Sequence, residues 1–149
     1  MNTLIISPAS VLDLGEISTI EQECFQAEAF SKRQLNYLIT TARGLFLLAK
    51  YESEIAGYVS IIINARHNTG RMYSIAVGLK YRTIGVGNKL FDAALKYAVE
   101  QGLRAVFLEV RTDNAAAIHM YEKNGFIKRC EKKDYYPDGA PAYSMVKYL

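Results

Sequence analysis

The chain has 149 residues, of which 50% are hydrophobic and 22% are charged, and this composition is typical of a globular domain with its own core. The formal net charge of +3 is too small to indicate a nucleic-acid-binding protein, so we expect no nucleic acid partner. The apolar runs are far shorter than the roughly 18 residues that a membrane span needs, and the N-terminus lacks the features of a signal peptide. We therefore expect one domain over residues 1–149, located in the cytoplasm and away from membranes.

Hydrophobic periodicity, helix caps and turn signals divide the chain into strands and helices. In chain order we expect a strand at 4–7, helices at 11–25 and 32–41, strands at 44–51, 55–64 and 71–77, a helix that follows Gly87 and stops at Gly102, a strand at 105–110, a helix at 115–124, and strands at 126–135 and 142–147. This order, βααβββαβαββ, predicts an α/β fold with a mixed sheet and helices on both faces.

The most informative segment is Tyr81–Asn88, YRTIGVGN, which lies between a strand-like run and an amphipathic run. Gly85 and Gly87 permit a tight turn with converging backbone N–H groups, and the positive end of the next helix dipole lies at the same place. Such a loop favours an anionic ligand, most naturally a pyrophosphate. The spacing R-x-x-G-x-G matches neither the P-loop nor the dinucleotide-binding pattern, so a plain strand-to-helix turn is the alternative.

Further along, residues 108–126 read LEVRTDNAAAIHMYEKNGF, and residues 135–139 read YYPDG, followed by Ala142 and Tyr143. Together with Ser74–Val77 and the glycine loop, these motifs resemble the Gcn5-related N-acetyltransferase (GNAT) superfamily. The resemblance covers the second half of the chain and is strongest to the branch that acetylates protein N-termini, which includes ribosomal-protein-alanine acetyltransferases. It implies the acyl-CoA N-acyltransferase fold, with acetyl-CoA as the co-substrate.

In the resembled family the glycine loop holds the pyrophosphate of acetyl-CoA, the preceding strand offers backbone groups to the pantetheine and the acetyl carbonyl, and a helix-capping asparagine bonds the pantetheine arm. The implied cofactor-binding residues are Ile75, Ala76, Val77, Arg82, Thr83, Gly85, Val86, Gly87, Asn88, Asn114 and Ala117. Thr83 and Ile84 depart from the basic or polar residues that relatives often carry there, so backbone groups and Arg82 are left to bind the phosphates. The basic cluster at 128–133 fits a solvated strand edge, or help in attracting these phosphates.

Glu109 lies in an otherwise apolar strand and shares a face with Phe107 and Arg111. A salt bridge to Arg111 or Arg104 is one explanation for a carboxylate there. The other is catalysis, because a half-buried carboxylate whose pKa is raised by desolvation can take the proton of an incoming ammonium, directly or through a water. The resemblance favours catalysis, since Glu109 matches the family's general base.

Asn114 fits an N-cap from its position alone, and Ala117 and Tyr121 follow it on the same helical face. An aromatic residue at this spacing is often part of the core. The resemblance implies that Tyr121 is instead the proton donor to the departing thiolate, a role that suits a phenol whose ordinary pKa is about 10.

Candidate substrate-binding residues are Phe30, Tyr135 and Tyr136. The two tyrosines precede Pro-Asp-Gly, which by itself predicts a hairpin between the last two strands. In the resembled branch a tyrosine-rich loop forms a wall of the peptide groove, and an apolar-Ser element matching Phe30 precedes the second helix, where amine specificity is set. No metal ligands are expected, because neither Cys24 and Cys130 nor the two histidines have metal-site spacing.

The resemblance therefore implies an enzyme that transfers an acetyl group from acetyl-CoA to the α-amine of a protein or peptide, by direct attack in a ternary complex. An α-amine with a pKa of about 7.7 to 8.0 is easier to deprotonate than lysine at about 10.4, so one carboxylate base suffices. No cysteine lies in the motifs to indicate an acyl-enzyme. The alternatives are a small-amine acetyltransferase, acting on a polyamine, amino acid or antibiotic, and a non-catalytic acyl-CoA-binding module.

Overall fold

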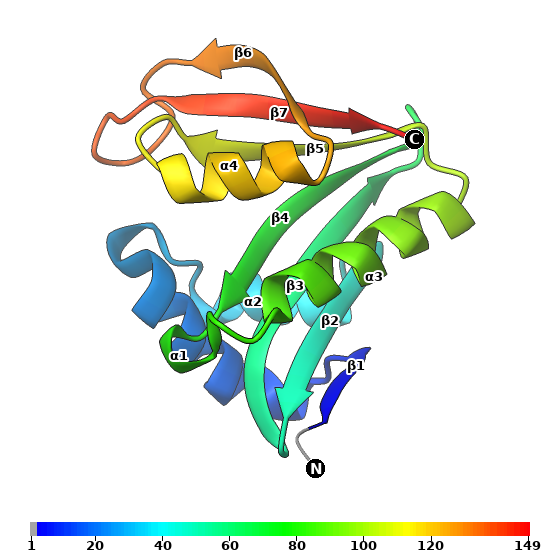
Figure 1. Ribbon diagram of the computed structural model, residues 1–149, viewed down its shortest axis with the longest axis vertical. Helices are drawn as coiled ribbons and strands as arrows, with labels where there is room; N and C mark the ends of the chain where they lie inside the picture. Colours follow the sequence, from blue (N-terminus) through cyan, green and yellow to red (C-terminus); the bar gives the residue numbers. More distant parts are fainter. Residues whose placement is uncertain (1–2) are drawn as a thin grey trace.

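The computed structural model describes residues 3–149, and its elements follow the predicted order (Figure 1). They are β1 (Leu4–Pro8), α1 (Leu14–Phe25), α2 (Lys32–Thr40), β2 (Gly44–Tyr51), β3 (Glu54–Asn64), β4 (Thr69–Val77), α3 (Val86–Glu100), β5 (Ala105–Arg111), α4 (Ala115–Lys123), β6 (Ile127–Lys132) and β7 (Ala142–Tyr148). Short 3₁₀ turns lie at Val11–Asp13, Gln26–Glu28 and Leu79–Tyr81. Among the described residues no helix is long and apolar enough to cross a membrane.

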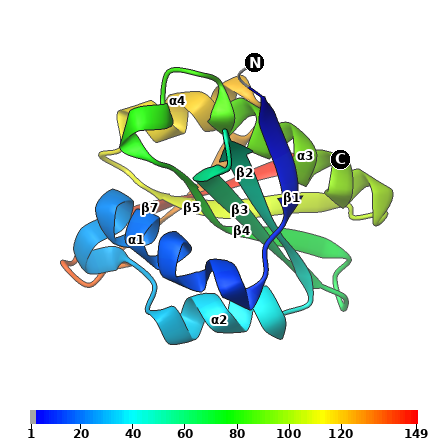
Figure 2. The ribbon, with the colours of Figure 1, turned by 90° about the horizontal axis from the view of Figure 1, so that it is seen from below.

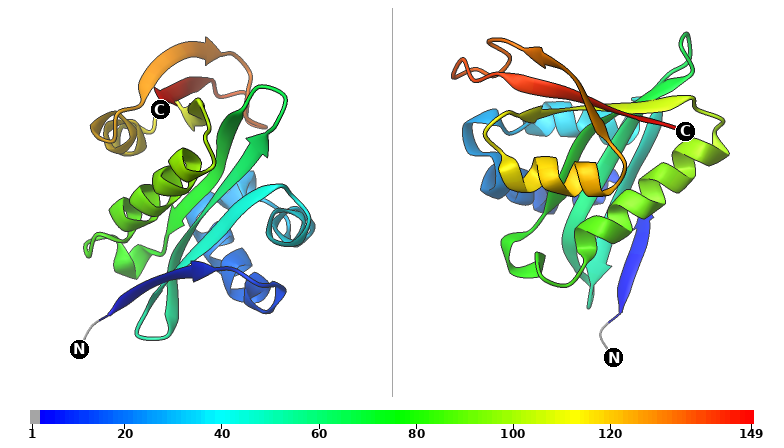
Figure 3. Two further views of the ribbon diagram at one scale, coloured as in Figure 1. Left: turned by 90° about the vertical axis from the view of Figure 1, so that its right-hand side faces the viewer. Right: turned by 45° about the horizontal axis from the view of Figure 1, so that its top comes forward.

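The strands form one mixed sheet in the order β1-β2-β3-β4-β5-β7-β6, in which only β4 and β5 run parallel. Helices α1 and α2 cover one face, while α3 and α4 cover the other (Figure 2; Figure 3, left). Each face has its own core, because alternate residues of the strands point to opposite sides. Ile17 and Leu35 pack with Tyr58 on the first face, and Phe91 packs with Leu108 on the second. The predicted mixed sheet with helices on both faces is confirmed.

The sheet splits between β4 and β5. These strands pair only over Thr69–Arg71 and Ala105–Phe107, and beyond this short ladder they diverge (Figure 1). In β4 the register shifts by one residue against β3, since Ser60 faces Ser74 while Ile61 faces Met72. Such bulges bend a strand and are frequent beside active sites. The carboxyl-terminal half of β4 is thereby left with a free edge that faces the gap.

Several element boundaries differ from prediction by a few residues, and two of these differences bear on the site. Strand β6 ends at Lys132 rather than at residue 135, because the chain turns at Asp134, whose φ is 52°. Tyr135 and Tyr136 consequently lie in the β6–β7 loop. Helix α3 begins at Val86, inside the glycine motif, rather than after Gly87.

Candidate active site

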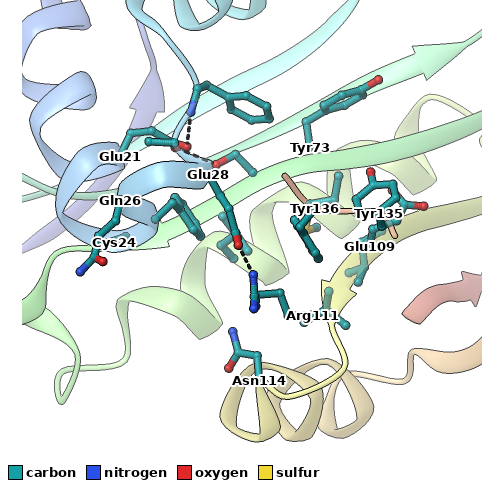
Figure 4. Close-up of a pocket in the computed structure, with 18 of the residues that line it drawn as sticks. Glu21, Cys24, Gln26, Glu28, Tyr73, Glu109, Arg111, Asn114, Tyr135 and Tyr136 are labelled. Atoms are coloured by element: carbon teal, nitrogen blue, oxygen red, sulfur yellow. Dashed lines mark hydrogen bonds and ion pairs between the residues drawn. The ribbon is translucent and has the colours of Figure 1, made fainter. Parts of the chain in front are cut away.

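A cleft of about 940 Å³ opens where β4 and β5 separate (Figure 4). We call it the central cleft. Its walls come from α1 and the segment that follows it, from β4 and β5, from α4 and from the β6–β7 loop. Seven predicted site residues line it: Phe30, Ile75, Glu109, Asn114, Tyr121, Tyr135 and Tyr136. The structure therefore gathers both predicted catalytic residues and all three substrate candidates, whereas Ala76, Val77, Ala117 and the glycine-loop residues lie outside this lining.

The glycine loop has the geometry of an anion-binding site. Gly85 adopts φ 79° and ψ 18° just before α3, a left-handed conformation that favours glycine. The N–H groups of Val86, Gly87 and Asn88 begin the helix and have no acceptor among residues 3–149. A Cβ added at Gly87 would make only ordinary contacts, 3.6 Å from Met120 and 3.7 Å from Val77, so the protein's own packing does not demand glycine there. Three free donors at a helix N-terminus fit a phosphate group.

The side chains of this loop contribute less than its backbone. Arg82 folds back toward the end of β4, where its Nε lies 3.1 Å from the Val77 carbonyl oxygen and its Nη2 lies 3.5 Å from Cys24 Sγ. Thr83 and Asn88 are exposed. In this arrangement Arg82 braces β4 against α1, and a phosphate contact by Arg82 stays a prediction.

Strand β4 carries the predicted pantetheine-binding segment. Ala76 is buried in the core on the α1 and α2 face, and Ile75 and Val77 are half-buried against the core on the other face. Their side chains therefore serve packing, as expected. Because β5 pairs with β4 only as far as Arg71, the main chain of residues 75–77 has no strand partner on that side.

Helix α4 brings Tyr121 to the cleft. Asn114 caps the helix, its Oδ1 accepting a hydrogen bond from the Ala117 N–H at 3.2 Å, which confirms the predicted N-cap. Tyr121 is buried, with its ring centre 5.5 Å from that of Phe91 and 6.1 Å from that of Phe126. Desolvation raises the pKa of Tyr121 to about 12, so the phenol is protonated at neutral pH. It can therefore donate a proton to a group in the cleft.

Glu109 has two cationic partners. Its side chain is only 8% exposed, with one oxygen bonded to Arg71 and the other 3.2 Å from Lys132 Nζ. Neither Arg111 nor Arg104, the partners suggested by the sequence, pairs with it. Both oxygens of the predicted general base are therefore held by cationic side chains that line the cleft or its edge.

Arg71 connects this carboxylate to the substrate side of the cleft. Its Nη2 also donates to the Tyr135 hydroxyl at 2.9 Å, and its guanidinium carbon lies 4.9 Å from the centre of the Tyr73 ring. Tyr73 in turn faces Phe30 across the cleft, with ring centres 6.4 Å apart. One arginine thus orients the predicted base and an aromatic wall residue together.

Arg111 ties three chain segments together across the cleft. It pairs with Glu28 after α1 (Figure 4), and also with Asp113 at 3.1 Å and with Asp138 of the β6–β7 loop at 3.0 Å. Its guanidinium carbon also lies 5.2 Å from the Tyr136 ring centre. The hydrogen bonds from Arg111 hold the pKa of Asp138 below its usual range. These contacts fix the loop that carries the two predicted tyrosines.

Glu21 anchors the opposite wall. This buried carboxylate accepts hydrogen bonds from the Tyr58 hydroxyl, from the Phe30 N–H at 2.9 Å and from Ser74 Oγ at 3.3 Å. Burial raises the pKa of Glu21, and the hydrogen bonds, led by that from Tyr58, oppose the rise. The result is a fixed position for Phe30, a predicted substrate residue.

Most of these polar anchors are not evident from the sequence. Glu21 carried a usable signal, because it lies four residues after Ile17 on the apolar stripe of α1, where a carboxylate needs a partner. Arg71 and Glu28 carried none, since their partners lie 38 and 83 residues away in the chain. Among residues 3–149, no group of His, Cys, Asp and Glu could hold a metal ion.

Known proteins share this architecture. Residues 14–126 match the profile of the Acetyltransferase (GNAT) family. The chain is 34% identical over 115 residues to the N-alpha-acetyltransferase of Sulfurisphaera tokodaii, which covers 70% of this chain and 69% of that protein. It is 32% identical over 149 residues to the N-terminal acetyltransferase A complex catalytic subunit NAA10 of Arabidopsis thaliana, covering 97% of this chain and 77% of that protein.

Among solved structures, the ribosomal-protein-S18-alanine N-acetyltransferase from Escherichia coli matches with a TM-score of 0.89 and 27% identity, over 99% of this chain and 94% of that chain. The predicted acyltransferase fold is thereby confirmed. The split sheet, the glycine loop and the family match agree, and the chain belongs to the GNAT family of acetyltransferases.

Proposed function

We propose that the protein transfers the acetyl group of acetyl-CoA to the N-terminal α-amine of a protein or peptide. One observation carries this proposal. Glu109 on β5 and Tyr121 on α4 line the same cleft, although they project from opposite faces of the sheet. A base on the amine side and an acid on the thioester side are what acetyl transfer needs. The relatives named as N-alpha-acetyltransferases support the choice of amine.

In the proposed complex, the N–H groups at the start of α3 hold the pyrophosphate of acetyl-CoA, with Arg82 and Thr83 beside them. Asn114 and the free edge of β4, over Ile75–Val77, hold the pantetheine arm. This arrangement would carry the thioester from the start of α3 along the gap between β4 and β5, toward Tyr121. A backbone N–H on the free edge of β4 supplies the hydrogen bond to the oxyanion.

The chemistry then needs one group that accepts a proton and one that donates a proton. Glu109 takes a proton from the substrate ammonium, directly or through a water, and the neutral amine attacks the thioester carbonyl carbon. The C–N bond forms, the C–S bond breaks, and Tyr121 donates its proton to the departing sulfur and recovers one from the nitrogen or from solvent. The net reaction releases CoA and one proton. Holding both reactants in place would supply much of the rate enhancement.

The character of the cleft favours a peptide over a polyamine. Three carboxylates line it, but Glu28 pairs with Arg111, Glu109 pairs with Arg71 and Lys132, and Glu21 is satisfied by neutral donors. None of the three is left free for a polycation. The remaining lining is rich in aromatic side chains suited to a peptide's first residues: Phe25, Phe30, Tyr73, Tyr135 and Tyr136.

The free thiols of Cys24 and Cys130 suit a reducing compartment, so we place the reaction in the cytoplasm.

The test is CoA release from acetyl-CoA in the presence of short peptides whose α-amine is free or blocked, alongside spermidine and free lysine. We expect release with free α-amine peptides only. Release only with spermidine or lysine would replace this proposal by a small-amine acetyltransferase. CoA binding without release under any condition would indicate a binding module.

A further inference from the structure

A second hollow of about 580 Å³ continues the central cleft along the face of the sheet that carries Phe107 and Glu109. We call it the basic groove. Its lining includes Arg71, Arg104, Phe107, Glu109, Arg129 and Lys132. Arg71, Tyr73 and Glu109 line both hollows, so a bound chain can pass from one to the other without leaving the surface.

The charges of the basic groove are unbalanced. Arg71, Arg104, Arg129 and Lys132 face a single carboxylate, that of Glu109, which already pairs with Arg71 and Lys132. Arg104 and Arg129 have no acidic partner anywhere in residues 3–149, and both are exposed. An ordinary solvated surface intersperses charges of both signs. This groove instead offers two unpaired cations beside a site that handles a substrate.

These cations are poorly placed for the phosphates of acetyl-CoA. Phe107 and Glu109 alternate along β5 with Val106 and Leu108, which are buried in the core beneath α3 and α4. The basic groove therefore lies on the face of the sheet opposite the start of α3, where the phosphates are proposed to bind. The expectation that the basic cluster at 128–133 attracts these phosphates does not account for Arg129 and Lys132, which line the groove.

We propose that the basic groove binds an acidic segment of the substrate polypeptide, a few residues after the acetylated N-terminus. This inference rests on the proposed function. With the first residue at Glu109 and Tyr121, an extended chain advancing about 3.3 Å per residue passes Tyr73 and Arg71 and enters the groove within a few residues. Carboxylates there meet Arg104 and Arg129, while Asn64 and His67 offer polar contacts to the peptide backbone.

The experiment compares three peptides that share their first two residues and carry glutamate, glutamine or lysine at positions three to six. Exposed ion pairs are worth about 0.2 to 1 kcal/mol each, so two pairs should raise kcat/KM for the glutamate peptide roughly two- to thirtyfold over the glutamine peptide. The lysine peptide should be the poorest. The preference should shrink at 0.5 M salt, because the paired groups are exposed.

In the double variant Arg104→Gln/Arg129→Gln, kcat/KM for the glutamate peptide should fall to that for the glutamine peptide, so that their ratio approaches one. Turnover of the glutamine peptide should stay unchanged. Lys96→Gln is the matched control, because Lys96 is exposed on α3 and its loss should leave the ratio intact. Equal kcat/KM for the three peptides would overturn the inference and leave the proposed function standing. The inference would also be overturned, in favour of a nucleic acid ligand, by two results together. Polyuridylate would bind the wild type but not the double variant, and peptide turnover would not depend on peptide charge.

If no free α-amine peptide is turned over, the proposed function fails. Fluorescence anisotropy with a labelled glutamate peptide then tests separately whether the basic groove binds an acidic ligand. Binding that weakens in the double variant but not in Lys96→Gln would support an acidic ligand. Equal binding by the wild type and the double variant would reject it.

Discussion

Replacing Tyr121 with phenylalanine separates the proposed chemistry from the fold. The ring contacts with Phe91 and Phe126 are retained in Tyr121→Phe, and the hydroxyl that is lost has no hydrogen-bond partner within the described chain. No buried polar group is left unpaired. We therefore expect the free energy of unfolding to change by less than about 1 kcal/mol, and Tm by less than about 4 °C.

The effect on catalysis should be much larger. A positioned general acid contributes about 10²- to 10⁴-fold, which corresponds to about 2.7 to 5.5 kcal/mol of transition-state stabilisation. The KM for acetyl-CoA should stay close to that of the wild type, because the proposed phosphate contacts lie in the glycine loop. Since burial raises the pKa of Tyr121 to about 12, the wild-type kcat should not fall through ionisation of this group below about pH 10.

The assay is CoA release with a free α-amine peptide, run at saturation and in single turnover, so that slow product release cannot hide the chemical step. Tyr97→Phe is the control, because Tyr97 is a half-buried tyrosine of α3 that does not line the central cleft. A single-turnover rate of Tyr121→Phe within threefold of the wild type, in a folded protein, would refute the assignment of Tyr121 as the acid.

Three further substitutions test the remaining parts of the site. Glu109→Gln should lower kcat/KM for free α-amine peptides about 10²-fold or more and displace the acidic limb of the pH–rate profile; an unaltered profile would contradict its role as base. Gly85→Ala should cost about 1 to 2 kcal/mol in chemical denaturation, because φ there is 79°, and should raise the KM for acetyl-CoA; unchanged stability and KM would contradict a required left-handed turn. Tyr58→Phe removes a hydrogen bond to the buried carboxylate of Glu21 and should cost about 1.5 to 3 kcal/mol near pH 7. Burial raises the pKa of Glu21 in the folded state, and the loss of the Tyr58 hydrogen bond should raise this pKa further. The folded protein then holds this proton more strongly than the unfolded chain does, so the stability of the variant should fall more steeply than that of the wild type as the pH rises above about 4.3. Thermal melts at pH 4 and pH 7 should therefore show the larger loss of stability at pH 7.

Local patterns were sufficient to predict the order of elements. The alternation of β5 placed Leu108 and Val110 in the core and Glu109 on the other side, as the structure has it. Ser31 caps α2 through a capping box with Gln34, a signal that is readable within four residues. The predicted strand runs to residue 135, three residues beyond the end of β6. Nothing in the local pattern at Lys133 and Asp134 indicates a turn, but Asp134 adopts a positive φ and ends the strand.

The partners of the charged residues could not be predicted in the same way. Arg111 shares a strand face with Glu109, and sequence proximity suggested that they pair. In the fold Arg111 is drawn to Glu28 and Asp138, which come from two distant segments, while Arg71 from β4 reaches Glu109. Such choices depend on how the split sheet brings strands and loops together, and no local periodicity encodes them.

Arg71 connects the central cleft with the basic groove, because it lines both and pairs with Glu109. Its guanidinium group also donates to the Tyr135 hydroxyl at 2.9 Å and lies 4.9 Å from the centre of the Tyr73 ring, so it already has partners in the central cleft. Arg104 and Arg129 are exposed and have no acidic partner in residues 3–149. A substrate carboxylate should therefore pair with these two arginines, away from the reacting atoms, and such contacts are made equally in the ground state and the transition state. The preference for an acidic substrate should accordingly appear in KM more than in kcat.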